Sequence, residues 1–282
     1  MRLCSVQSVF PRCKSSLFQI TCPAVPKYKR NKVRTACDIV RRIENWPTAF
    51  AMRVRQSSPG LRLLRFRDGL NVICRAATRD WDVVHELLFA GSYGRAMRYL
   101  KDQPGSPVVL DLGGNIGLFS LLAASAHSRA QVFSYEPGPP NHRLLEMNRL
   151  ANPALSDRIC LRTEAVAGRS ETVEWFFDDK NPGGSGLFAS NGSKFKVQVR
   201  AFADVLYELK LPVALAKIDI EGAEFELLSA TPAEAWSRIS AISLELHDDP
   251  NGKMTHLDFL NCMKSLGFQI EEEAVCSYFL HR

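Results

Sequence analysis

The chain has 282 residues, the length of one domain with an extension or of two small domains. Hydrophobic residues make up 46% of it and charged residues 23%, which is ordinary usage for a globular protein. No stretch approaches the roughly 18 uninterrupted apolar residues of a transmembrane helix, and no secretory signal is evident. We therefore expect a cytoplasmic protein with no membrane span.

The net charge of +6 is concentrated near the N-terminus. Residues 1–37 contain eight Lys or Arg and no acid, which leaves 28 basic and 30 acidic residues over 38–282. Because a nucleic-acid-binding domain usually carries its own basic face, we expect no nucleic-acid partner. Residues 1–37 have no sustained period, and we expect a basic, disordered leader. Organellar targeting is the alternative, because transit peptides share this acid-free composition.

Residues 38–103 show a less regular pattern. The periodicity predicts helices over 38–50 and 80–90, and between them strands over 61–66 and 70–74 joined by an Asp-Gly turn. This unit is too small to be an enzyme alone. We expect it to form a helix and hairpin extension that packs on the following domain and covers part of its site.

From residue 104 to the C-terminus, strands and helices alternate. The predicted strands cover 108–112, 131–135, 159–163, 213–219 and 239–247, with two short ones near 268–270 and 277–280. The predicted helices cover 116–126, 139–151, 224–230 and 255–265. A hairpin over 172–178 and 195–200 carries a glycine-rich loop, 181–186, which we interpret as a mobile lid. The pattern predicts a Rossmann-like α/β fold, doubly wound around a mainly parallel, seven-stranded sheet.

A glycine-rich turn follows the first predicted strand of this domain. Asp111 ends the strand, and Gly113 and Gly117 allow a sharp turn into the next helix. Asn115 replaces the second glycine of the dinucleotide fingerprint, which argues against a nicotinamide oxidoreductase. Glu136 ends the next strand and can accept both ribose hydroxyls of an adenosine. We interpret this as a site for S-adenosylmethionine (AdoMet), with Asp111 near its ammonium group.

Acidic residues and a histidine follow two later strands. Asp219 and Glu221 follow one strand, and Glu245 and His247 lie at the end of the next. The acids either face water or bind a proton or a cation. Our candidates for a general base or an orienting group are Asp219, Glu221 and His247, the last because its ordinary pKa is about 6.5. We assign no metal ligand; a divalent ion held by Asp219, Glu221 and Glu245 is the alternative.

Taken together, these motifs resemble the FkbM-type methyltransferases from about residue 80 onward. The residues that carry the resemblance are Asp111-Leu-Gly-Gly-Asn-Ile-Gly117, Glu136-Pro137, Asn148, Lys217-Ile-Asp-Ile-Glu-Gly-Ala-Glu224 and Glu245-x-His247. The resemblance implies a class I AdoMet-dependent enzyme that methylates a hydroxyl of a sugar or secondary metabolite. It also implies that Asp111, Gly113, Asn115, Gly117 and Glu136 surround the cofactor. Residues 201–204, Ala-Phe-Ala-Asp, depart from the family's Thr-Leu-Asp, which we expect to affect helix capping.

Two alternatives remain beside this interpretation. A nucleic-acid methyltransferase is disfavoured, because the chain lacks an Asn/Asp-Pro-Pro-aromatic string and a Pro-Cys pair. A protein that binds AdoMet without catalysis is the other, and the acids at both strand ends weigh against it. We expect the partner to be a small molecule with a hydroxyl acceptor.

Overall fold

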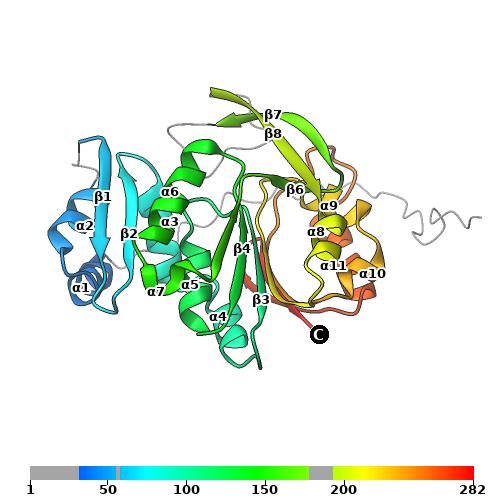
Figure 1. The fold of residues 1–282 in the computed structure, drawn as a ribbon, viewed down its shortest axis with the longest axis horizontal. Helices are drawn as coiled ribbons and strands as arrows, with labels where there is room; N and C mark the ends of the chain where they lie inside the picture. The colour runs from blue at the N-terminus through cyan, green and yellow to red at the C-terminus, as the bar shows by residue number, and fades with distance from the viewer. Residues whose placement is uncertain (1–31, 55–57, 178–192) are drawn as a thin grey trace, which may run out of the picture.

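The computed structural model describes residues 32–54, 58–177 and 193–282 (Figure 1). Its central sheet has seven strands in the order β11-β12-β10-β9-β3-β4-β5. The strands are β3 (Val108–Leu112), β4 (Gln131–Tyr135), β5 (Ile159–Arg162), β9 (Val213–Ile218), β10 (Ile239–Glu245), β11 (Gln269–Ala274) and β12 (Ser277–His281). All neighbours from β10 to β5 are parallel, whereas β12 runs antiparallel to β10 and β11. The predicted Rossmann-like, mainly parallel sheet is confirmed.

Helices cover both faces of this sheet because its strands alternate their buried side chains between two cores. On β3, Val109 faces one core, and Val108 and Leu110 face the other. The first core takes side chains from α4 (Gly94–Lys101), α5 (Leu118–Ala126), α6 (Pro139–Leu150) and α7 (Pro153–Ser156). The second takes them from α8 (Phe202–Glu208), α9 (Glu224–Ala230), α10 (Ala233–Trp236) and α11 (His256–Ser265). Within the described residues, no helix is long and apolar enough to cross a membrane.

The N-terminal part differs from the predicted single helix over 38–50. It forms α1 (Lys32–Arg42) and α2 (Trp46–Arg53), so a helix begins inside the predicted leader, of which residues 1–31 lie outside the described part. Between the two helices, the side chain of Asn45 donates to Leu63 O at 2.7 Å and accepts from Arg65 N at 2.9 Å. This pairing turns the chain toward the hairpin and ends the first helix.

The predicted hairpin is confirmed as β1 (Gly60–Arg65) and β2 (Asn71–Ala76), which pair antiparallel. The predicted helix over 80–90 is α3 (Asp80–His85) followed by a π-helix, Glu86–Ala90. Figure 1 shows the hairpin at one end of the molecule, with α6 between β2 and the central sheet.

Asn148 of α6 and Asn152, which precedes α7, pair with the backbone of β2 as a neighbouring strand would. The Asn148 amide accepts from Ile73 N at 2.5 Å and donates to Ile73 O at 2.9 Å. One turn later, the Asn152 amide accepts from Asn71 N at 2.8 Å and donates to Asn71 O at 2.7 Å. These bonds satisfy the edge of β2 and join the N-terminal unit, residues 32–103, to the domain that contains the central sheet.

A smaller sheet lies beyond the carboxyl ends of the central strands. It has the order β6-β8-β7, made by β6 (Ala165–Ala167), β7 (Glu171–Phe177) and β8 (Ser193–Ala201), and Figure 1 shows β7 and β8 above the main sheet. The predicted hairpin is thereby confirmed, and the 181–186 loop interpreted as a lid lies outside the described residues. Ala201 gives α8 no side-chain cap, as expected; Ser170 Oγ instead accepts from Ala201 N at 2.8 Å.

Candidate active site

A cavity with about 590 Å³ of empty space opens at the carboxyl ends of β3, β4 and β9. Its wall is formed by the glycine-rich loop, the end of β4, the small sheet and residues 219–223. A smaller cavity lies beside it and receives Val83 and Tyr93 from the N-terminal unit. Gly113, Asn115 and Asp219 line both cavities, so the predicted loop and one predicted acid stand where the two meet.

Glu136 lies in the wall of the larger cavity and is only 5% exposed. Its Oε2 accepts from Asn115 N and its Oε1 from Gly138 N, both at 2.8 Å. Burial raises the pKa of this carboxyl group to about 7, against the lowering effect of the two backbone donors. A carboxylate has about four acceptor positions, so two remain for a ligand in the cavity.

The glycines of the loop are required by close packing. Gly113 has a φ of 77°, and a Cβ there would come within 2.0 Å of Asp219 O. Gly117 has a φ of 88° and forms the start of α5. Asn115 also has a positive φ, 49°, and its buried Oδ1 has no hydrogen-bond partner. The loop therefore touches the end of β9 and offers one free acceptor to the cavities.

Asp111 does not line either of these two cavities, and its contact with an ammonium group stays a prediction. The side chain is fully buried. Its Oδ2 accepts from Ser120 Oγ at 2.6 Å and from Ser134 Oγ at 3.2 Å. Its Oδ1 lies 3.7 Å from Lys217 Nζ. Successive side chains of β3 point to opposite faces of the sheet, and that of Asp111 lies among Ser120, Ser134 and Lys217. In this geometry Asp111 positions Lys217, which in turn binds the glycine-rich loop.

Lys217 connects the loop to β9. Its ammonium donates to Gly113 O at 2.6 Å and pairs with Asp219 Oδ2 at 3.0 Å. Burial by itself lowers the pKa of Lys217, but Asp219 and Asp111 outweigh it and raise this pKa, so the group stays cationic. The sequence motif contains Lys217, but we did not predict a role for it. The sequence feature that could have indicated one is a single lysine in an otherwise apolar, buried strand.

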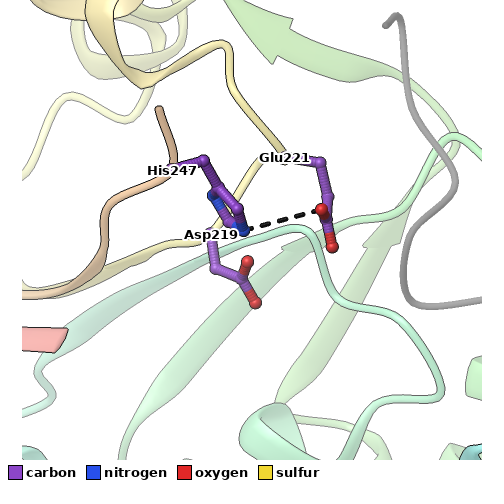
Figure 2. A group of neighbouring side chains, drawn as sticks. All are labelled: Asp219, Glu221 and His247. Atoms are coloured by element: carbon purple, nitrogen blue, oxygen red, sulfur yellow. Dashed lines mark ion pairs between the residues drawn. The ribbon is translucent and has the colours of Figure 1, made fainter. Parts of the chain in front are cut away.

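The structure brings Asp219, Glu221 and His247 together, as predicted (Figure 2). One potential ligand atom from each lies within 4.8 Å of the other two. His247 Nε2 is 3.5 Å from Glu221 Oε2. Glu245 does not belong to this group.

The pKa values of both neighbouring glutamates are raised. For Glu245 the charge of Asp219 is the largest cause, and burial is the next. For Glu221 burial is the largest cause, and the charge of Asp219 adds to it.

Glu224 was missed as a site residue and holds His247 in place. It is fully buried, and its two oxygens accept from Ile220 N and Gly222 N, each at 3.0 Å. Its Oε1 also lies 3.0 Å from His247 Nδ1. Burial lowers the pKa of His247, but the hydrogen bond to Glu224 and the charges of Glu224, Asp219 and Glu221 together outweigh it and raise the pKa to about 10. The pKa of His247 is thus raised above the ordinary value of about 6.5 that suggested a general base, and its catalytic role stays a prediction.

Comparison with known proteins identifies the family. Residues 111–270, more than half of the chain, match the profile described as the methyltransferase FkbM domain. The chain belongs to the FkbM methyltransferase family. One relative, methyltransferase sdnD of Sordaria araneosa, is 25% identical over 206 residues, which cover 62% of this chain and 78% of the relative.

Two further comparisons are with a second relative and a solved structure. The 31-O-demethyl-FK506 methyltransferase FkbM of Streptomyces tacrolimicus is 26% identical over 175 residues, covering 52% of this chain and 67% of the relative. The crystal structure of methyltransferase FkbM from Methylobacillus flagellatus KT aligns with a TM-score of 0.44 at 19% identity, over 62% of this chain and 44% of that chain.

Proposed function

We propose that this FkbM-family methyltransferase binds AdoMet and methylates a hydroxyl oxygen of a small molecule. The observation that carries the proposal is the position of Glu136. Two backbone donors hold its carboxylate in the wall of a cavity at the carboxyl edge of the sheet, where ligands of open α/β folds bind. Its two remaining acceptor positions suit the adjacent hydroxyls of an adenosine ribose.

The other groups around the cavities also fit AdoMet. Asn115 Oδ1 is a buried acceptor without a partner, and Asp219 is a carboxylate that lines both cavities. Asn115 Oδ1 would accept from the ammonium group of the methionyl moiety, and Asp219 would place a negative charge near that group. When bound, AdoMet supplies an electrophilic methyl group to the acceptor oxygen.

The acids at the rim support the choice of a hydroxyl acceptor. A hydroxyl must lose its proton as it is methylated, and Asp219 and Glu221 place carboxylate oxygens in the cavity wall that can take it. His247 lies beside Glu221 and orients it. With Glu136 also in the wall, the cavity is lined by three acids, which would repel the phosphates of a nucleic acid. We therefore favour a small neutral acceptor.

Calorimetric titration tests the cofactor. Wild-type protein is titrated with AdoMet, S-adenosylhomocysteine and NADH, beside Glu136→Gln and the matched control Glu146→Gln, whose acid is exposed on α6. We expect both adenosyl ligands to bind the wild type and the control. Binding to Glu136→Gln should be about 10- to 100-fold weaker, because hydrogen bonds to a charged group contribute about 1.5–3 kcal/mol. Preference for NADH, or no loss in Glu136→Gln, would refute the proposal.

A further inference from the structure

We propose that Asp219, Glu221 and His247 form a binding site for a divalent transition-metal ion at the rim of the cavity. Each residue offers one ligand atom, two carboxylate oxygens and one imidazole nitrogen, and these atoms lie within 4.8 Å of one another. Figure 2 shows the three side chains converging from the segments that follow β9 and β10. Of the described residues, this is the one group of at least three such side chains with this spacing.

The spacing suits a metal ion after a small adjustment. Bonds of about 2.0–2.2 Å to nitrogen and oxygen place the ligand atoms of a tetrahedral ion about 3.3–3.6 Å apart. His247 Nε2 and Glu221 Oε2 already have this separation, 3.5 Å. The ligand atoms that lie up to 4.8 Å apart close on an ion when their side chains rotate by about 0.5–1 Å. The side chains of Asp219, His247 and Glu221 are 24%, 29% and 34% exposed, so an ion can reach them from solvent.

The orientation of His247 leaves one ring nitrogen for the ion. Glu224 binds Nδ1, and backbone donors fix both of its oxygens. The remaining nitrogen, Nε2, forms an ion pair with Glu221 Oε2 at 3.5 Å, and an ion that binds between these two groups would displace the proton from Nε2. A histidine that binds a metal usually donates its other ring N–H to a carboxylate or a carbonyl, which is the arrangement here.

A separate observation indicates a ligand beside the ion. Trp175 is 7% exposed, its indole N–H has no hydrogen-bond partner, and it lines the same cavity as Asp219 and Glu221. A buried donor without a partner points to an acceptor oxygen on a molecule that enters this cavity. Three protein ligands leave positions open on the ion, so the same molecule can bind it through oxygen. This last step rests on the proposed function; the metal site itself does not.

The donor set also predicts which ions bind. An imidazole nitrogen with two carboxylates favours transition metals, whereas magnesium and calcium prefer oxygen ligands throughout. We therefore expect Zn²⁺ and Mn²⁺ to bind more tightly than Mg²⁺ and Ca²⁺. The alternative ligand set from the sequence, with Glu245 in place of His247, would reverse this preference.

The test is to titrate the full chain with each of the four ions in the absence of AdoMet. Binding is measured by calorimetry and, for Mn²⁺, also by electron paramagnetic resonance. One Mn²⁺ should bind per chain, and His247→Gln and Glu221→Gln should weaken it at least 10-fold. Two matched controls remove a neighbouring group outside the site: Glu245→Gln, and His256→Gln, whose ring contacts His247 O at 3.1 Å. Both should stay within about threefold of the wild type.

Several outcomes would overturn the site. The site would be refuted if the wild type bound neither Mn²⁺ nor Zn²⁺, or if His247→Gln bound these ions as tightly as the wild type. A loss in Glu245→Gln larger than that in His247→Gln would replace it by an oxygen-only site. Circular dichroism of each variant shows that it is folded, and Glu221→Gln keeps the test decisive if His247→Gln does not fold. Because no AdoMet is present, failure here is distinct from failure of the proposed cofactor.

Discussion

One backbone position sets the distance between the glycine-rich loop and the end of β9. Gly113 has a positive φ and stands where a Cβ would meet Asp219 O at 2.0 Å. We predict that Gly113→Ala lowers the free energy of unfolding by about 3 kcal/mol or more, since backbone strain adds to the clash. Gly105 is the matched control, with a φ of 69° and nothing within 4 Å of the added Cβ. Urea denaturation should show a loss of only about 1 kcal/mol for Gly105→Ala; equal losses would contradict the packing argument.

Glu136 should make the stability depend on pH. Burial raises its pKa from 4.5 to about 7, so the folded state binds this proton more tightly than the unfolded chain. The stabilisation is fully present below pH 4.5 and is lost as the pH rises through 7. Between pH 5 and pH 8, the free energy of unfolding should fall by about 2 kcal/mol more in the wild type than in Glu136→Gln. Parallel urea titrations at the two pH values measure this, and equal slopes would contradict it.

Sequence patterns predicted that Glu136 and Asp219 lie at one edge of the sheet, because strand ends can be found from short apolar runs. Asp219 and Glu136 follow such runs, and parallel strands bring their carboxyl ends to one edge. The patterns did not show that Asp111 is buried beneath the loop, because this depends on hydroxyl partners from α5 and β4. Nor did they show the raised pKa of His247, which depends on contact with Glu224, 23 residues away in the chain.

Among the elements, α6 satisfies the free edge of β2 through a side chain, where another strand would do so through its backbone. The Asn148 amide exchanges two hydrogen bonds with Ile73 and also donates to Ile116 O at 2.7 Å. We predict that Asn148→Ala lowers the free energy of unfolding by about 2–4 kcal/mol, because it leaves backbone groups unpaired in a buried contact. Met147→Ala, at an exposed neighbour on the same helix, should change it by less than about 1 kcal/mol. Thermal denaturation compares the two, and similar losses would refute the role of Asn148.

Element types were predicted well where the period was long and failed where a tertiary contact broke it. The spacing of apolar residues over 38–50 predicts one continuous helix. In the structure the side chain of Asn45 instead binds the backbone of β1, and the segment forms two helices. The helix over 224–230 matched its predicted bounds, because Gly222 before it and the extended backbone of Thr231 after it mark both ends. Turn residues can be recognised from the local sequence, whereas the hydrogen-bond partner of a polar side chain such as Asn45 depends on the tertiary structure.

For the whole molecule, the N-terminal unit and one face of the central sheet share a single core. Ile39 and Trp81 from the unit belong to the same buried cluster as Val109 and Leu215 from the sheet. The unit also supplies Tyr93 to the smaller cavity. The sequence suggested a boundary near residue 104 because the pattern becomes regular there. A change of pattern does not mark a break in packing, and here the buried contacts continue across it.

This shared core predicts that the chain unfolds in one cooperative step. Trp81 lies in the core that includes the N-terminal unit, and Trp236 lies in the core on the opposite face of the sheet. In each of two variants that keep one of these as the sole tryptophan, fluorescence and circular dichroism should report the same urea midpoint and slope, because neither core persists without the sheet between them. The two probes are compared within one variant, since removal of different buried tryptophans changes the stability of each variant differently. If Trp81 fluorescence changed at lower urea than the circular dichroism of the same variant, the N-terminal unit would be a separate domain docked through Asn148 and Asn152, and it would cover the smaller cavity as a part able to detach.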